Sequence, residues 1–168
     1  MEASGRQSLT LSTAHVVTIS DGVFGGTRED KSGAALVALL RAGGFDVSGP
    51  VVVPDEVAQI AEAIEIAIAR GANLVVTTGG TGLGPRDVTP QATAPLLDYT
   101  VPGIAEEMRR AGVASTPMAA LSRSMAGVRG RTLIINVPGS VQGATESLEA
   151  VMAILGHALK LLRGDTAH

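Results

Sequence analysis

Residues 74–90 read LVVTTGGTGLGPRDVTP, and this stretch decides the fold expected for the chain. The apolar and β-branched run at residues 74–77 is typical of a strand buried on both faces of a sheet. Four glycines follow within residues 79–84 and end the strand. Thr89 and Pro90 then have the form of a helix start, a capping residue followed by a proline. The stretch predicts a buried strand, a glycine loop and a helix in direct succession.

The same alternation of strand and helix patterns extends to both ends of the chain. Continuous apolar strands between amphipathic helices indicate an α/β fold with a mostly parallel sheet that is covered on both faces. Further strands are predicted at residues 16–19, 51–53 and 133–136, and helices at residues 32–41, 57–68, 104–111 and 141–162.

The chain has 168 residues, the size of a single domain. We expect a flexible leader over residues 1–13, one domain over residues 14–164 and a short tail over residues 165–168. The leader lacks the apolar stretch of a secretory signal, and no apolar run approaches the length of a membrane span. The sequence therefore predicts a cytoplasmic protein without a membrane partner.

Composition excludes several classes of function. The absence of cysteine excludes disulfides, thiolate metal sites and a cysteine nucleophile. The net charge is −3 and aromatic residues make up only 2%, so neither a basic surface nor stacking platforms are available for nucleic acids. We expect no nucleic-acid partner.

Segments rich in glycine and aspartate follow the predicted strands. Because ligands of parallel α/β sheets bind beyond the carboxyl ends of the strands, we expect these segments to gather at one edge. They are residues 20–26, 54–55, 79–87 and 138–140.

The glycine loop at residues 79–84 favours phosphate binding, since glycines let several backbone N–H groups approach one anion. A flexible turn is the alternative interpretation. The loop is neither a P-loop, because GxxxxGK[ST] is absent, nor the GxGxxG dinucleotide fingerprint. Residues 138–140 offer a second anion site at a helix start, or an ordinary helix cap.

Three aspartates, Asp21, Asp55 and Asp87, each come shortly after a strand. Convergent carboxylates suit Mg²⁺ with a bound triphosphate, although each residue alone also fits a turn or a cap. Arg86 could neutralise phosphate charge, and Arg123, taken alone, fits a solvated surface position better.

Taken together, these motifs resemble the molybdenum-cofactor biosynthesis proteins of the MoaB/Mog type, the molybdopterin adenylyltransferase family. The matching segments occur in the family's order over nearly the whole chain after residue 13. They are TISD (18–21), DKSG (30–33), VPDE (53–56), TTGGTG (77–82), RDVTP (86–90), PG (102–103), SR (122–123) and PGS (138–140).

The resemblance implies a three-layer α/β/α fold, a homotrimer or a multiple of three, and a reaction. In that reaction AMP passes from Mg²⁺-ATP to the terminal phosphate of molybdopterin, and a partner protein then inserts molybdate. It also implies catalytic roles for Asp55 and Asp87, which we assign to Mg²⁺ binding. The implied molybdopterin- and phosphate-binding residues are Ser20, Gly79, Gly80, Thr81, Gly82, Ser122, Pro138, Gly139 and Ser140. We add Asp21 and Arg86 to this binding site, for the reasons given above from the residues themselves.

Two alternatives stay open. Val141 stands where the adenylyltransferase branch often has a second proline, and this feature favours a molybdopterin carrier with little catalysis. A nucleotide pyrophosphatase is the other alternative, because a related domain occurs in competence-damage proteins. Those resemble TGGLGPT at the loop, whereas this chain has TGGTG at residues 78–82.

Overall fold

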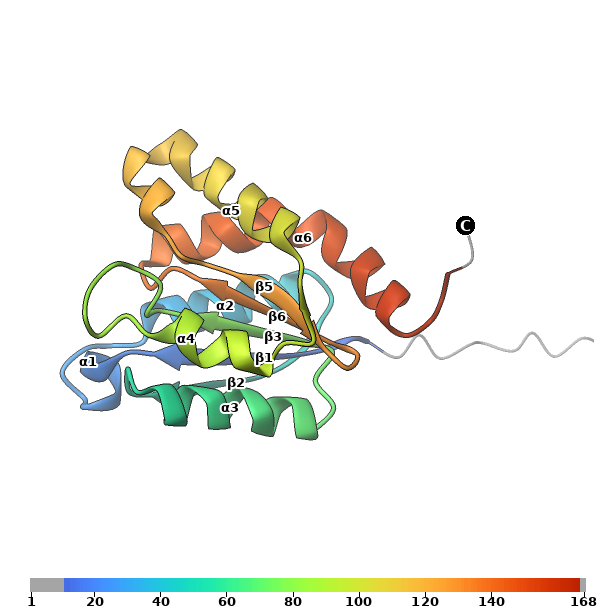
Figure 1. Cartoon of the computed structure of the whole chain (residues 1–168), viewed down its shortest axis with the longest axis horizontal. Coiled ribbons are helices and arrows are strands. Elements are labelled where there is room, and N and C mark those ends of the chain that lie inside the picture. The colour runs from blue at the N-terminus through green and yellow to red at the C-terminus, as the bar shows by residue number, and fades with distance from the viewer. Residues whose placement is uncertain (1–10, 167–168) are drawn as a thin grey trace, which may run out of the picture.

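The computed structural model describes residues 11–166, so residues 1–10 of the predicted leader and residues 167–168 of the predicted tail lie outside the described residues. Six strands form one sheet in the order β2-β1-β3-β6-β5-β4 (Figure 1). The first four of these are parallel to their neighbours, and β5 and β4 are antiparallel. The strands are β1 (Thr13–Ile19), β2 (Asp46–Val53), β3 (Leu74–Thr78), β4 (Tyr99–Thr100), β5 (Ala126–Arg129) and β6 (Thr132–Val137).

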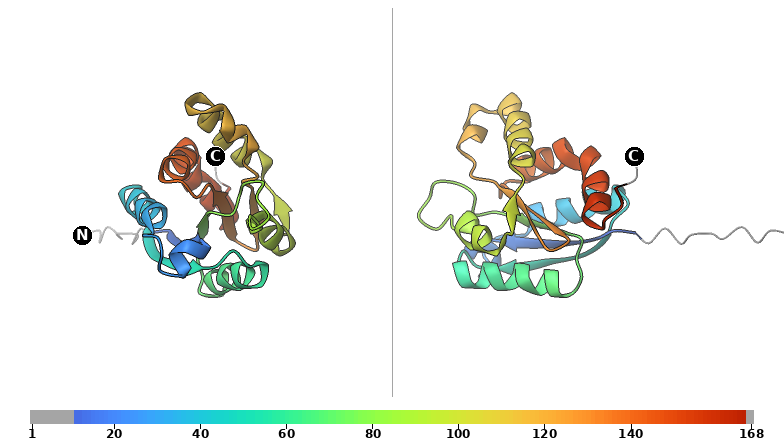
Figure 2. Two further views of the ribbon diagram at one scale, coloured as in Figure 1. Left: turned by 90° about the vertical axis from the view of Figure 1, so that its left-hand side faces the viewer. Right: turned by 45° about the vertical axis from the view of Figure 1, so that its right-hand side comes forward.

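Helices cover both faces of this sheet, as the end-on view of Figure 2 shows. The α-helices are α1 (Asp21–Phe24), α2 (Lys31–Ala42), α3 (Val57–Ala69), α4 (Thr89–Thr93), α5 (Pro102–Ser115) and α6 (Val141–Leu162). Two short 3₁₀ helices, η1 (Ala94–Leu96) and η2 (Pro117–Leu121), follow α4 and α5. The packing of α2, α5 and α6 on one face and of α3 and α4 on the other confirms the three-layer α/β/α prediction.

The alternation of side chains along β3 shows why both faces must be covered. Leu74 and Val76 belong to the core beneath α2, α5 and α6, while Val75 belongs to the core beneath α3 and α4. All three side chains are fully buried. Successive side chains of a strand point to opposite faces of the sheet. Apolar side chains at all of these positions are therefore buried only when both faces are covered, here by helices.

The predicted strands and helices are all present, whereas helix α1, the two 3₁₀ helices and two short strands were not predicted. The two strands are β4 and β5, which extend the sheet antiparallel beyond β6. They have only two and four residues, too few to show a periodic pattern. Within residues 11–166, no helix is both long and apolar enough to cross a membrane.

The topology sets the carboxyl ends of β1, β3 and β6 side by side. Thr18 pairs with Thr78 across β1 and β3, and Thr78 pairs with Val137 across β3 and β6. The chain leaves all three strands at the same edge, where α1 and the loop of residues 79–88 lie on the left in Figure 1. The predicted gathering of the strand-end segments at one edge is therefore observed.

Two isoleucines of α3 provide a matched test of this packing. Ile64 is fully buried against the sheet, whereas Ile66 on the same helix is 43% exposed. Ile64→Ala is expected to lower the free energy of unfolding by about 2–5 kcal/mol, because it leaves a cavity in the core. Ile66→Ala should cost less than about 1 kcal/mol. Urea unfolding at one protein concentration measures both, and equal losses would contradict the assigned faces.

Candidate active site

Two cavities open at the carboxyl edge of the sheet. The first, of about 470 Å³, lies between the glycine loop, α5, η2 and α6. The second, of about 670 Å³, lies between the end of β1, the segment before α2 and the glycine loop. Four residues line both cavities and form a shared wall: Gly80, Asp87, Gly139 and Ser140.

Gly79 and Gly80 shape the loop at this wall. Both have positive φ, +107° and +66°, which side chains rarely adopt. A Cβ atom on Gly79 would overlap the carbonyl oxygen of Ile19, and one on Gly80 would overlap Oγ1 of Thr89. The loop can therefore pass this close to β1 and α4 only with glycine at both positions.

Polar contacts hold the rest of the glycine loop. Thr89 donates its hydroxyl to the carbonyl oxygen of Gly79 over 2.8 Å. Arg123 donates from Nε to the carbonyl oxygen of Gly82 over 2.9 Å and from Nη2 to that of Asp87 over 2.6 Å. Arg123 is thus a half-buried residue that fixes the loop, rather than the solvated surface arginine expected from the sequence.

The segment Pro138, Gly139 and Ser140 forms the opposite side of the wall. A Cβ atom on Gly139 would lie 3.2 Å from the Cα of Gly79, so the two loops are in close contact. Ser140 accepts a hydrogen bond at Oγ from the backbone N–H of Gly143 over 3.0 Å, which caps α6. Its position in the wall leaves the helix start facing both cavities.

The structure brings Asp55 and Asp87 to the second cavity. Asp55 Oδ2 accepts from the backbone N–H of Asp21 over 2.8 Å, and Asp87 Oδ2 accepts from that of Gly84 over 2.9 Å. Their other carboxylate oxygens, both Oδ1, accept no hydrogen bond from any described residue. Each aspartate therefore keeps one oxygen available for a ligand.

The pKa values of Asp55 and Asp21 are shifted in opposite directions. Burial raises the pKa of Asp55, and the nearby carboxylates of Asp21 and Asp87 act in the same direction. The hydrogen bond from Arg86 lowers the pKa of Asp21. A cation in the second cavity would stabilise the charged form of Asp55, because opposite charges offset desolvation.

Arg86 does not line either cavity. Its guanidinium donates to both carboxylate oxygens of Asp21, at 3.0 and 3.1 Å, and to Glu56 at 2.9 Å. Asp21 likewise lies beside the cavities rather than in their lining. The pair joins the loop after β1 to the segment after β3, and the predicted phosphate-binding roles of both residues stay predictions.

The remaining predicted residues divide between the two cavities. Thr81, Gly82 and Ser122 line the first cavity. Ser20 lines the second, where its Oγ accepts from the backbone N–H of Val23 and caps α1. Lys31 also lines the second cavity, and it provides a cation there.

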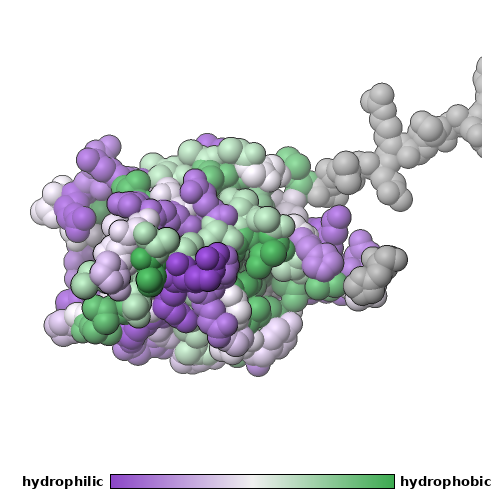
Figure 3. Space-filling view, turned by 90° about the horizontal axis from the view of Figure 1, so that it is seen from above, coloured by the Kyte–Doolittle hydropathy of each residue, from purple (hydrophilic) through white to green (hydrophobic). Residues whose placement is uncertain are grey.

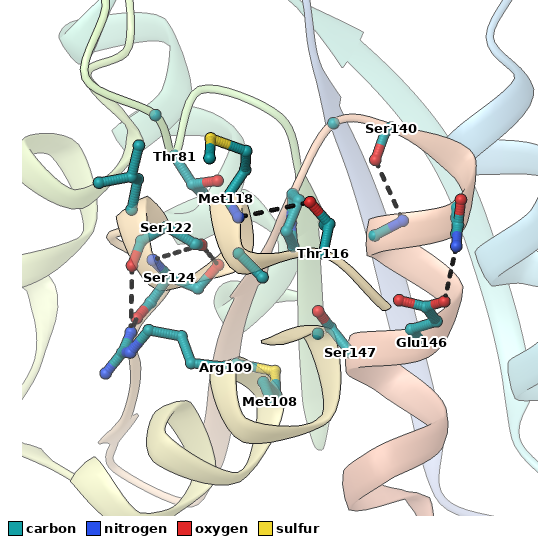
Figure 4. A pocket seen from close by; sticks show the side chains of 18 of the residues that line it. Thr81, Met108, Arg109, Thr116, Met118, Ser122, Ser124, Ser140, Glu146 and Ser147 are labelled. Carbon is teal, nitrogen blue, oxygen red and sulfur yellow. Dashed lines mark hydrogen bonds between the residues drawn. The ribbon is translucent and has the colours of Figure 1, made fainter. Parts of the chain in front are cut away.

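The sequence did not indicate that α5 contributes to the site. Arg109 lines the first cavity and donates from Nη1 to the carbonyl oxygen of Ser124 over 2.7 Å (Figure 4). Met108 and Gly112 on the same helix give that cavity an apolar side. Only the spacing of apolar residues in this helix was visible in the sequence, and such spacing is common to every core helix.

No group of three metal-ligating side chains occurs among residues 11–166. Two carboxylates nevertheless suit Mg²⁺, which is usually bound through one or two protein carboxylates together with substrate phosphates. The free oxygens of Asp55 and Asp87 fit that pattern.

A glycine loop at the carboxyl edge of a parallel sheet, with cavities on both sides, defines the class of α/β proteins whose site suits phosphorylated ligands. The family model described as "Probable molybdopterin binding domain" matches residues 15–157. The chain belongs to this family, and the resemblance noted in the sequence is confirmed.

Similar proteins, some with solved structures and some with assigned functions, support the membership of this family. The molybdopterin biosynthesis enzyme MoaB from Thermus thermophilus is 51% identical, with a TM-score of 0.86 over 92% of this chain and 98% of that one. The molybdopterin adenylyltransferase of Helicobacter pylori J99 is 36% identical over 92% of this chain and 91% of its own length. A molybdenum cofactor biosynthesis bifunctional protein from Chlorobaculum tepidum is 39% identical over 89% of this chain. The chain spans only 48% of that relative's length.

Replacing Gly79 tests the close approach at the shared wall. Gly71→Ala is the control, because Gly71 also has a positive φ but no atom lies within 4 Å of the place that a Cβ would occupy. The control should cost about 1–2 kcal/mol of unfolding free energy from backbone strain alone. Gly79→Ala should cost more, since β1 must also move. Equal costs in thermal or urea unfolding would contradict the overlap with Ile19.

Proposed function

We propose that this chain is a molybdopterin adenylyltransferase that transfers AMP from ATP to the terminal phosphate of molybdopterin. One observation carries the proposal: the glycine loop and Asp87 stand in a wall shared by an apolar cavity and a polar, charged cavity. Two substrates bound on the two sides of this wall would bring their phosphates together there. The relatives named molybdopterin adenylyltransferase support the same reaction.

Each cavity suits one substrate. The first has an apolar side made by Met108, Met118 and Leu121, which suits a flat pterin ring. The second contains Arg28 and Lys31 together with Asp55 and Asp87, which suits a triphosphate with its cation. We therefore assign molybdopterin to the first cavity and ATP to the second.

The chemistry needs positioning more than proton transfer. The second pKa of a phosphate monoester is about 6, so the molybdopterin phosphate is largely dianionic at neutral pH. One of its oxygens attacks the α-phosphorus of ATP, the new P–O bond forms, and the bond to the bridging oxygen of the β-phosphate breaks to release pyrophosphate. Backbone N–H groups of residues 80–82 and the start of α6 would hold the two anions at the wall, whereas the N–H of Gly79 donates to the carbonyl oxygen of Val137.

Asp55 and Asp87 are the residues proposed to hold Mg²⁺ through their free oxygens. When bound, Mg²⁺ supplies charge neutralisation of the triphosphate. In this account neither aspartate acts as a general base.

In the alternative function, the chain is a molybdopterin carrier. It has the same cavities but does not adenylylate the molybdopterin that it binds. The observation that favours it is the sequence of the wall itself, where Val141 follows Ser140 in place of a proline. Tight molybdopterin binding without formation of adenylylated product would support it.

The proposal also covers the oligomeric state of the protein, its location in the cell and the protein that receives its product. On the face over α5 and α6, apolar patches lie among polar ones (Figure 3). Exposed Val113, Ile154 and Leu161 could contribute to contacts in a homotrimer or a multiple of three. We further propose that the protein acts in the cytoplasm and that a molybdate-insertion protein receives its product.

Substitution of Asp87 tests the proposed reaction. Purified protein, molybdopterin, ATP and Mg²⁺ should give adenylylated molybdopterin and pyrophosphate, detected by mass spectrometry. Asp87→Asn keeps the shape of the side chain but removes its charge, so product formation should fall by at least about 100-fold, as for loss of a group that stabilises transition-state charge.

Asp165→Asn, at an exposed position after α6, is the matched control and should keep full activity. An Asp87→Asn variant with unchanged rate and unchanged Mg²⁺ dependence would refute the role given to Asp87. Molybdopterin binding without product from the native chain would refute the enzyme and leave the carrier.

A further inference from the structure

The first cavity contains a carboxylate that the reaction described above does not use. Glu146 lies on α6 and lines the cavity on the side away from the shared wall. Its Oε1 accepts from Ser115 Oγ over 2.8 Å and from Gln142 Nε2 over 2.9 Å. Its Oε2 accepts no hydrogen bond from any described residue.

A hydroxyl group accompanies this carboxylate. Ser147 is only 5% exposed and lines the same cavity. Figure 4 shows the Ser147 and Glu146 side chains projecting from α6 on the side that bounds the cavity. A hydroxyl both donates and accepts hydrogen bonds, so Ser147 can pair with a polar atom of a ligand bound in this cavity.

Two neighbouring side chains stabilise the charged form of Glu146. Hydrogen bonds from Gln142 and Ser115 lower its pKa, so the group is a carboxylate at neutral pH. A carboxylate is a pure hydrogen-bond acceptor. It therefore selects a ligand edge that presents donors only.

We propose that Glu146 recognises the 2-amino-4-oxo edge of the pterin, with Ser147 beside it. This inference rests on the proposed function and adds the residue that selects the pterin over other flat rings. The pterin edge presents an exocyclic amine next to a ring N–H, two adjacent donors to which the free Oε2 of Glu146 can act as acceptor. The corresponding adenine edge presents an amine next to an unprotonated ring nitrogen, which a carboxylate repels.

The position of Glu146 along α6 fits this assignment. Ser140, in the shared wall, precedes it by six residues, which corresponds to about 9 Å along a helix. The phosphate of molybdopterin would lie at the wall, and its fused rings would extend along α6 toward Glu146. Met108 and Met118 line the same cavity, where their thioethers can contact an aromatic ring.

Glu146→Gln tests the proposal, with Glu149→Gln as the control. Glu149 lies on the same helix, is exposed and lines neither cavity. Glu146→Gln should raise the Kd for molybdopterin, measured by anaerobic calorimetry, by at least about tenfold, as for loss of a hydrogen bond to a charged acceptor. The KM for ATP should not change. Glu149→Gln should alter neither value, and circular dichroism confirms that each variant is folded.

Ring analogues test the chemical basis of the preference. 6-Hydroxymethylpterin should compete with molybdopterin at least about tenfold better than the lumazine counterpart, in which a carbonyl replaces the 2-amino group. Glu146→Gln should lose this preference. GMP, which has the same donor edge on a purine, should compete more weakly than the pterin.

The outcomes separate this proposal from the proposed reaction. If the native chain adenylylates molybdopterin and Glu146→Gln binds it equally well, the role of Glu146 is wrong and the enzyme stands. If the native chain binds molybdopterin without turnover and Glu146→Gln weakens binding, the enzyme is wrong and the role of Glu146 stands. Stronger competition by GMP than by the pterin would overturn the pterin assignment.

Discussion

Three backbone segments meet at Gly79, and the rest of the site depends on this close approach. The loop after β3 passes so near to Ile19 that no side chain fits between them, and Gly139 meets Gly79 from the other side. The parallel register of β1, β3 and β6 brings these segments to one edge. The wall that results is made of Gly80, Asp87, Gly139 and Ser140, and each of these residues lines both cavities.

Side chains around the shared wall hold the loop in place and supply groups that can bind ligands. Arg123 and Thr89 hold the loop through its carbonyl groups, and the backbone N–H groups of residues 80–82 stay available for anions. Asp55 and Asp87 each retain a free oxygen on the polar side. The apolar side is made largely by α5, η2 and α6, elements that come late in the chain. The two substrates would thus be held by different parts of the fold and meet only at the wall.

Much of the fold and the core of the site could be predicted because their signals are local. The run of residues 74–77 and the glycines after it show a buried strand and its turn without reference to the rest of the chain. The contacts of Arg86, Arg123 and Glu146 could not be predicted in this way. Arg86 bonds Asp21, 65 residues away in the chain, and Glu146 bonds Ser115, 31 residues away. Such pairs are decided by how α5, α6 and the loops pack, which no periodic pattern encodes.

The most direct test of the account is a crystal structure of this chain with adenylylated molybdopterin bound. We expect the diphosphate at the wall of Gly80, Asp87, Gly139 and Ser140, with the pterin along α6 and the adenosine on the side of Lys31. A diphosphate bound away from this wall, or both rings in one cavity, would contradict it.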